Sequence, residues 1–191
     1  MMPPVPAFLR AMLTTSCLAL AAAAIAAAAP AGADPQAQPQ ALDVAVFDQL
    51  KALAGRWEGR VDDATGTPVA LEMAVTSNGR AVLERVFAGS PHEMTTVYFL
   101  AHDRLLATHY CSIGNQPGFE LVDTSKPTDI VMTLAGGTGF DPKTDQHAHG
   151  VHLQVLEPDR LRVEWQFRKG EAEPTYARMT LTRTAAAAAQ P

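Results

Sequence analysis

Cysteine is scarce in this chain of 191 residues, which holds only Cys17 and Cys111. Residues 1–33 contain only one charged side chain, that of Arg10. No cluster of Lys and Arg occurs, and the formal net charge is −5. A chain without a basic cluster lacks the electrostatic footprint of a protein that binds nucleic acid or an anionic membrane surface. We therefore expect no nucleic-acid partner.

Residues 1–33 have the three parts of a secretory signal peptide. Arg10 supplies the basic region and an alanine-dominated apolar stretch follows it, while Ala31 and Ala33 fit a cleavage site before Asp34. The alternative is an uncleaved membrane anchor, since the apolar stretch is about long enough to span a bilayer. Alanine is a weak membrane residue, so cleavage is favoured. We expect a periplasmic or secreted protein with no stable membrane anchor after cleavage.

Removal of residues 1–33 leaves 158 residues and a single thiol, Cys111. That length suits one domain with a substantial core. An exported chain with one thiol has no internal disulfide, so packing must stabilise it. Composition predicts a disordered lead over residues 34–42, a folded domain over residues 43–184 and a disordered alanine-rich tail over residues 185–191.

One short helix is predicted at the start of the folded domain. Ala45, Phe47, Leu50 and Leu53 recur at helical spacing and would form its buried face. Asp43 precedes them and is the expected N-cap, because a carboxylate there can accept hydrogen bonds from the free backbone N–H groups of the first turn.

Almost every segment after the predicted helix alternates apolar and polar residues with the period of a strand. In residues 160–168, Leu161, Val163, Trp165 and Phe167 share one face. About nine turn-rich breaks separate about ten such segments, and most links are short enough for hairpins. Closure into a barrel buries the apolar face and removes the sheet edges, whereas a two-layer sandwich is the alternative. The expected fold is all-β: an antiparallel up-and-down barrel of about ten strands with a short N-terminal helix.

The helix leading into Gly55 and Trp57 resembles the opening of the calycin superfamily, which includes lipocalins, fatty-acid-binding proteins and nitrobindin-like barrels. Residues 105–117 are similar to segments of uncharacterised bacterial exported proteins of this kind. The resemblance implies that Trp57 closes one end of the barrel, packed by a basic residue of the last strand, either Arg178 or Arg183. It also implies an internal cavity for a small apolar molecule without identifying that molecule.

Histidines and a cysteine occupy one end of two predicted apolar strand faces. Alternation places His109 and Cys111 on the apolar face of the fifth strand, and His147 and His149 on that of the eighth. Odd strands end where even strands begin in an up-and-down barrel, so both groups are expected in one mouth. The side chains expected to contact a ligand are His109, Cys111, His147, His149, Trp165 and Phe87.

Imidazole and thiolate are preferred ligands of zinc, copper and haem iron. His109, Cys111, His147 and His149 are therefore also a candidate metal site, and the cofactor, haem or a transition metal, stays open. The alternative is a hydrogen-bonded network in which Cys111 is a small buried hydrophobe. The favoured function is an exported barrel that holds a small, largely apolar molecule. A haem- or metal-binding barrel and a non-catalytic structural or interaction module of the cell envelope are the other hypotheses.

Catalytic motifs do not stand out in the sequence. His109 and Cys111 are two residues apart on a strand, which separates their side chains by roughly 7 Å, too far for direct proton transfer. The glycine-rich residues 136–139 join two predicted strands and do not open a helix, so they predict a flexible loop and not a nucleotide site. Binding is favoured over catalysis.

Overall fold

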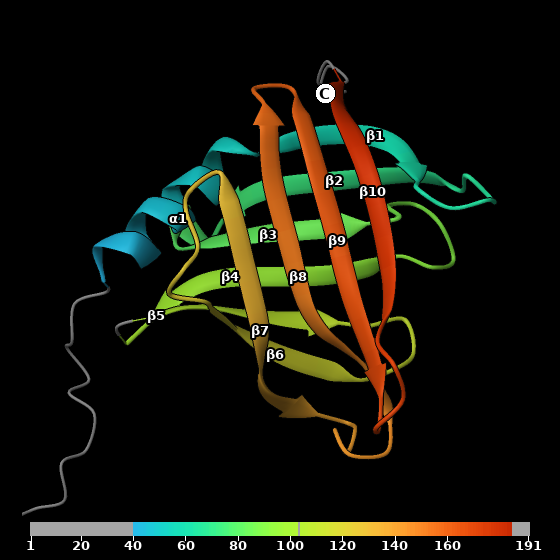
Figure 1. Ribbon diagram of the computed structural model, residues 1–191. Helices are drawn as coiled ribbons and strands as arrows, with labels where there is room; N and C mark the ends of the chain where they lie inside the picture. Colours follow the sequence, from blue (N-terminus) through green and yellow to red (C-terminus); the bar gives the residue numbers. More distant parts are fainter. Residues whose placement is uncertain (1–39, 103, 185–191) are drawn as a thin grey trace, which may run out of the picture. The chain divides into compact units, whose positions relative to one another are not determined.

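The computed structural model describes residues 40–102 and 104–184. The predicted signal peptide, residues 34–39 of the predicted lead and the predicted tail lie outside these residues. Ala41 and Leu42, which were predicted to be part of the disordered lead, instead begin a helix. The described chain forms a helix, a short 3-10 turn and ten strands that close into a barrel in the order β1-β10-β9-β8-β7-β6-β5-β4-β3-β2 (Figure 1). The elements are α1 (Ala41–Ala52), β1 (Gly55–Val61), β2 (Pro68–Thr76), η1 (Ser77–Gly79), β3 (Ala81–Val86), β4 (Met94–Ala101), β5 (Arg104–Tyr110), β6 (Gln116–Leu121), β7 (Asp129–Thr138), β8 (Gln146–Glu157), β9 (Arg160–Lys169) and β10 (Thr175–Thr184).

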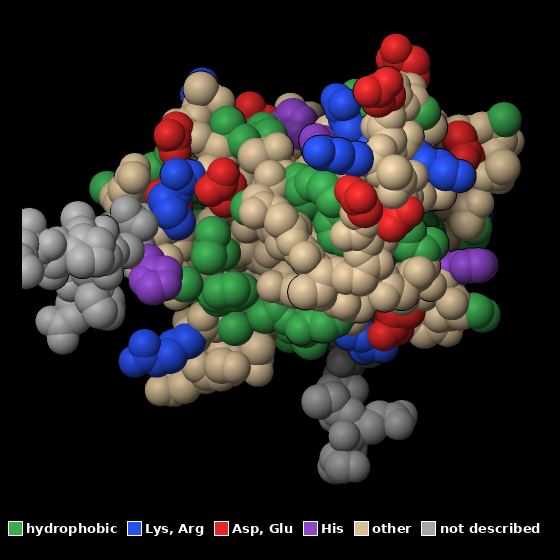
Figure 2. Space-filling model, turned by 90° about the horizontal axis from the view of Figure 1, so that it is seen from below, with side chains coloured by type: hydrophobic (Ala, Val, Ile, Leu, Met, Phe, Trp, Pro, Cys, Tyr) green, Lys and Arg blue, Asp and Glu red, His purple; other side chains and the backbone are tan. Residues whose placement is uncertain are grey.

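Period-two alternation accounts for the barrel. Each strand pairs antiparallel with its neighbour in the chain, and β1 pairs with β10 to close the sheet. On β9, Leu161, Val163 and Trp165 are buried, while Arg162 and Glu164 between them are on the outer face. Charged side chains of both signs are scattered over the surface in Figure 2 and do not gather into a patch of one sign. The predicted all-β, ten-stranded antiparallel barrel with one short helix is confirmed.

Trp57 fills one end of the barrel beside the C-terminal end of α1. Its side chain is fully buried, and its indole Nε1 donates a hydrogen bond to the Leu53 carbonyl at 2.9 Å. The guanidinium of Arg183 lies 4.1 Å from the centre of the Trp57 ring and donates to the Ala54 carbonyl at 2.7 Å. Arg183 is thus the basic residue on Trp57, whereas Arg178 pairs with Glu164.

Asp43 does not cap α1, contrary to prediction. The helix begins at Ala41, its N-cap is Gln40, and no side chain caps it. The Asp43 carboxylate is instead buried and accepts the backbone N–H of Leu105 at 2.6 Å. A buried N–H at the start of β5 needs an acceptor, and Asp43 provides one while joining the helix to the barrel. Within residues 40–102 and 104–184, no helix has the length and apolarity needed to cross a bilayer.

Glycines 136 and 137 belong to β7 and pair with β6, so the flexible loop predicted for residues 136–139 is wrong for its first three residues. Gly137 has a φ of 152°, and a Cβ at this position would lie 2.5 Å from the Gln116 carbonyl oxygen. The two strands approach too closely here for any side chain. Glycine therefore permits strand pairing at this point, and its presence does not mark a flexible segment.

A β-bulge interrupts the alternation of β8 between Ala148 and Gly150. On one side of the bulge, Ala148 is fully buried opposite Phe167 of β9. On the other side, Val151 is also buried and faces the interior. His149 is the additional residue that the bulge inserts. Because of this one extra residue, the side chains between the start of β8 and the bulge point to the opposite face from the one that simple alternation predicts.

Candidate functional site

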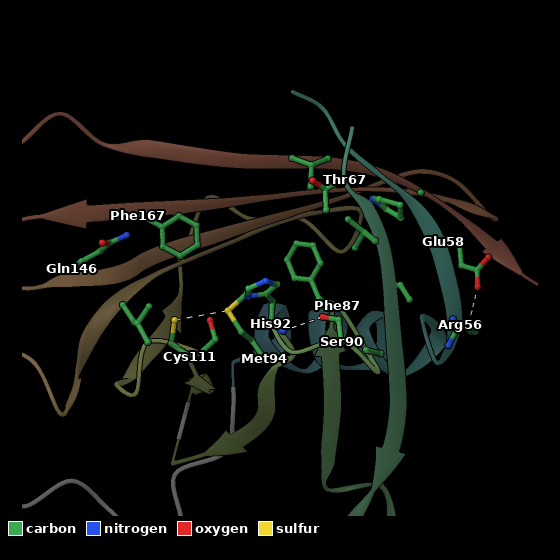
Figure 3. A pocket seen from close by; sticks show the side chains of 18 residues that line it. Arg56, Glu58, Thr67, Phe87, Ser90, His92, Met94, Cys111, Gln146 and Phe167 are labelled. Carbon is green, nitrogen blue, oxygen red and sulfur yellow. Dashed lines mark hydrogen bonds and ion pairs between the residues drawn. The ribbon is translucent and has the colours of Figure 1, made fainter. Parts of the chain in front are cut away.

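A cavity of about 820 Å³ lies at the end of the barrel opposite Trp57. It is lined along β1 from Arg56 to Val61, where β5 and β9 end, where β2, β4 and β8 begin and at the β3–β4 turn. Its apolar lining includes Val61, Val69, Phe87, Met94, Ile113 and Phe167. In Figure 3 the rings of Phe87 and Phe167 approach the same space from different elements, with Met94 and Cys111 below them. This end of the barrel therefore offers an apolar chamber to a small molecule.

Phe87 is held over the cavity by an unusual backbone conformation. Its φ is 56°, in the left-handed region that disfavours a residue with a side chain by roughly 1 kcal/mol. Phe87 directly follows the last residue of β3 and begins the turn to β4. Strained positions of this kind concentrate at functional sites. Here the strain directs an aromatic ring toward the cavity.

The thiol of Cys111 and the thioether of Met94 lie side by side at the floor of the cavity. Their sulfur atoms are 3.8 Å apart. Each residue is one inward-facing step from a buried polar side chain. Met94 precedes Thr96 on β4, and Cys111, directly after the end of β5, follows His109 by two residues. Inward-facing neighbours on one strand are about 7 Å apart. The two sulfurs thus separate the cavity from a deeper group of polar residues.

This deeper group, here named the buried polar layer, consists of Glu84, Thr96, Tyr98, His109 and Trp165. Register places Glu84 opposite Thr96 and Thr96 opposite His109, so three neighbouring strands contribute side by side. The Tyr98 hydroxyl donates to Glu84 Oε2 at 2.8 Å, and Thr96 Oγ1 is 2.9 Å from His109 Nδ1. Trp165 packs on the His109 ring with 4.5 Å between ring centres. All five side chains are buried.

Burial changes the protonation of two members of this layer. Desolvation raises the pKa of Glu84 to about 7, although hydrogen bonds from Tyr98 and Thr96 act in the opposite direction. Desolvation also lowers the pKa of His109 to about 4. The imidazole is therefore neutral near pH 7, and the Glu84 carboxyl is close to the midpoint of its titration.

Three atoms of the buried polar layer have no hydrogen-bond partner within the described residues: Glu84 Oε1, His109 Nε2 and Trp165 Nε1. Buried polar atoms almost always have partners, because an unsatisfied one costs about 1–3 kcal/mol. Three such atoms in one layer, beneath an apolar cavity, indicate a place where a polar group from outside the chain would be stabilised.

The predicted ligand contacts divide into two places around this cavity. Phe87 and Cys111 line it, and Gln146 at the start of β8 lines it too, so β5 and β8 do meet at one mouth. His109 and Trp165 lie in the buried polar layer below. Whether any of these side chains contacts a ligand stays a prediction.

His147 and His149 do not join this group, so the predicted placement on the inner face is wrong. The bulge turns His147 to the outer face opposite Arg168 of β9. There its ring stacks on Phe140 with 4.8 Å between ring centres, and Nδ1 is 2.9 Å from the Asp145 carbonyl oxygen. A hydrogen bond of 3.2 Å joins His147 Nε2 to His149 Nδ1. The two histidines form a separate pair at the rim of the sheet.

The predicted metal set of His109, Cys111, His147 and His149 is consequently split. Among residues 40–102 and 104–184, no group of three or more His, Cys, Asp or Glu side chains is arranged to hold a metal ion. Desolvation, followed by the charge of Arg168 and then that of His147, lowers the pKa of His149. Burial and the nearby Arg168 therefore both favour the neutral form of His149.

The sequence analysis did not predict Glu84, Thr96 or Tyr98 as site residues, although the alternation pattern contained a sign of them. Alternation puts Glu84 between Val82 and Val86 on the inner face of β3, and an acid on an apolar face is a departure from pattern. The corresponding polar positions on β4 are Thr96 and Tyr98. Their meeting with His109 depends on strand register, which alternation alone does not supply.

Comparison with known proteins adds little. No protein-family model matches the chain, and no curated protein matches it. Among solved structures, the chain is similar to the crystal structure of Rv2717c from M. tuberculosis, with 16% sequence identity and a TM-score of 0.47. The match covers 73% of this chain and 98% of that chain. A likeness of this size assigns neither a family nor a function, so the functional argument rests on the residues themselves.

Proposed function

We propose that this barrel binds a small, largely apolar molecule in the cavity at its mouth. The observation that carries the proposal is the contrast between its two ends. Trp57 and α1 fill one end, whereas a mainly apolar cavity opens at the other and extends along β1 as far as Arg56, with a total volume of about 820 Å³. Cavities that bind small molecules span about 300–1,000 Å³ and are lined mainly by apolar and aromatic side chains.

Charge at the cavity also favours an apolar ligand. Arg56 is the only Lys or Arg in its described lining. Its guanidinium is already paired with Glu58 at 2.8 Å and Glu72 at 2.6 Å. In Figure 3, Arg56 and Glu58 lie apart from Cys111 and Phe167. An anionic ligand would find no free basic partner beside the two aromatic rings.

A calycin-like relationship forms part of this proposal. It is supported by the arrangement at the closed end, where Arg183 of β10 packs on Trp57 of β1. The ten-stranded barrel that follows a short helix agrees with the same relationship. Ligand binding inside the barrel is what that relationship would imply.

Filling the cavity should abolish binding without unfolding the protein. Val61 lines the cavity and is partly exposed, so Val61→Trp places an indole in existing space. We expect the affinity for Nile red, an uncharged apolar dye, to fall at least about tenfold. Fluorescence titration of purified protein measures the dissociation constant, and circular dichroism checks that the barrel is retained.

The matched control is Leu156→Trp. Leu156 lies on β8 and is 39% exposed, and it does not line the cavity. This variant should bind Nile red as the natural protein does. Equal loss in both variants, or unchanged binding in Val61→Trp, would contradict the proposed site.

Export is a separate proposal that depends on residues 1–33. We propose that they direct secretion and are removed before Asp34, given the basic, apolar and small-residue pattern described above. The expected result is a mature N-terminus at Asp34 when the full-length chain is expressed in a bacterial host. Intact-mass analysis of the periplasmic and culture fractions measures this, and recovery of an intact Met1 in those fractions would argue against it.

A further inference from the structure

We infer that the buried polar layer is a subsite for the uncharged, hydrogen-bonding head of the ligand, so that the barrel prefers amphiphiles such as long-chain alcohols over fatty acids or amines. This inference rests on the proposed function. The proposed function explains how the cavity binds the apolar part of the ligand. The inference adds which polar head group the residues below the cavity would select.

The buried polar layer lies one step below the cavity lining, and none of its five residues lines the cavity itself. Met94, Cys111 and Phe167 line the cavity, and each stands one inward-facing step toward the mouth from Thr96, His109 or Trp165. Met94 and Cys111 are the cavity-lining neighbours of Thr96 and His109, and their sulfur atoms are 3.8 Å apart. A methionine side chain is flexible and unbranched, so it can move aside at small cost when a ligand head enters.

The unpartnered atoms define what the head must offer. Trp165 Nε1 can only donate, so the head must accept a hydrogen bond. The neutral His109 has one nitrogen engaged with Thr96, and Glu84 Oε1 can accept when the carboxyl is ionised. A hydroxyl group accepts through its oxygen and donates through its hydrogen, and it therefore matches both kinds of atom.

Charge in the barrel interior excludes the other common heads. The buried polar and charged residues of the described part, wherever they lie, are Asp43, Glu84, Thr96, His109, Asn115, Ser125 and His147, and those beneath the cavity are Glu84, Thr96 and His109. None is Lys or Arg, so a fatty-acid carboxylate would lie unpaired beside the acid Glu84. An ammonium head could pair with Glu84, but it would leave the Trp165 N–H without an acceptor and would lose its hydration.

Three probes of equal chain length test the inference: 1-decanol, decanoate and decylamine. Calorimetric titration at about pH 7 should show decanol binding at least about tenfold more tightly than either charged probe, because a buried unpaired charge is costly. In nitrogen–proton correlation spectra, decanol should shift the Trp165 indole signal. The Trp57 indole signal should stay in place, because its N–H already donates to Leu53.

Substitutions at Glu84 separate hydrogen bonding from charge. Glu84→Leu should weaken decanol binding about tenfold, whereas Glu84→Gln should retain it within about threefold, because an amide still hydrogen-bonds. Glu164→Leu is the control and should leave binding unchanged, because Glu164 lies on the outer face of β9, pairs with Arg178 and does not line the cavity.

The outcomes separate the two proposals. Tighter binding of decanoate or decylamine, or decanol binding with an unmoved Trp165 signal, overturns the inference and leaves the proposed cavity intact. Absence of binding by all three probes and by Nile red overturns both proposals. Equal losses in Glu84→Gln and Glu84→Leu would show that the charge of Glu84 matters, and would likewise overturn the uncharged-head preference.

Discussion

Replacement of Trp57 by alanine should lower the free energy of unfolding by about 3–5 kcal/mol, the range for removal of a large buried aromatic side chain. The indole is fully buried, and its removal also leaves the Leu53 carbonyl without its 2.9 Å hydrogen bond. The Arg183 guanidinium, 4.1 Å from the ring centre, would lose the surface on which it packs. Urea unfolding followed by circular dichroism measures the change.

Trp57→Phe is the matched control for this prediction. It keeps an aromatic ring under Arg183 and removes the indole N–H, so its loss should be clearly smaller than that of Trp57→Ala. If the alanine variant does not fold, the phenylalanine variant still measures the contribution of the hydrogen bond. A loss below about 1 kcal/mol in Trp57→Ala would show that Trp57 does not close the barrel.

Glu84→Gln should stabilise the protein at neutral and alkaline pH by up to about 3 kcal/mol. Burial raises the pKa of Glu84 from 4.5 to about 7, so the folded state binds this proton more tightly than the unfolded state. The contribution of Glu84 to stability is therefore fully present below about pH 4.5 and is lost as pH rises through about 7. Glutamine has no proton to lose, so the advantage of the variant should grow across this interval.

Urea unfolding of both proteins between about pH 4.5 and pH 8 measures this difference. His109, whose pKa burial lowers to about 4, titrates in both proteins, so its effect largely cancels in the comparison. A difference in stability that is independent of pH would contradict the prediction.

Glu93→Gln provides a control of opposite sign. Hydrogen bonds from Arg85 and then from the Gly89 backbone lower the pKa of Glu93 to about 2. Its contribution to stability is therefore present above about pH 4.5 and is lost as pH falls toward 2. At neutral pH, Glu93→Gln should therefore destabilise the protein, whereas Glu84→Gln should stabilise it.

Local pattern was enough to predict the architecture of this protein. Alternation of apolar and polar residues indicated about ten strands, the short links indicated a meander, and burial of one apolar face required closure. The helix before Trp57 was also readable from residues close together in the chain, whereas the position of Trp57 at one end was implied by the calycin resemblance. These features depend on period and spacing, which are properties of short segments.

The candidate site depends on relations that no short segment contains. His147 was assigned to the wrong face because the bulge at Ala148 and Gly150 adds one residue, and a single added residue reverses the alternation. Asp43 was assigned to a helix cap because its buried partner, the Leu105 N–H, lies 62 residues away. Neither fact is visible in the periodicity of the segment concerned.

The buried polar layer shows the same division most clearly. Alternation places Glu84 and His109 on inner faces, and the sequence determines this much. Only strand register brings both beside Thr96, and only complete enclosure removes the water that would otherwise solvate them. The raised pKa of Glu84 and the lowered pKa of His109 both follow from that loss of solvent. The side of the strand to which a side chain points is determined by its neighbours along the chain. Which residues lie opposite one another, and which lose contact with water, is determined by the closed barrel as a whole.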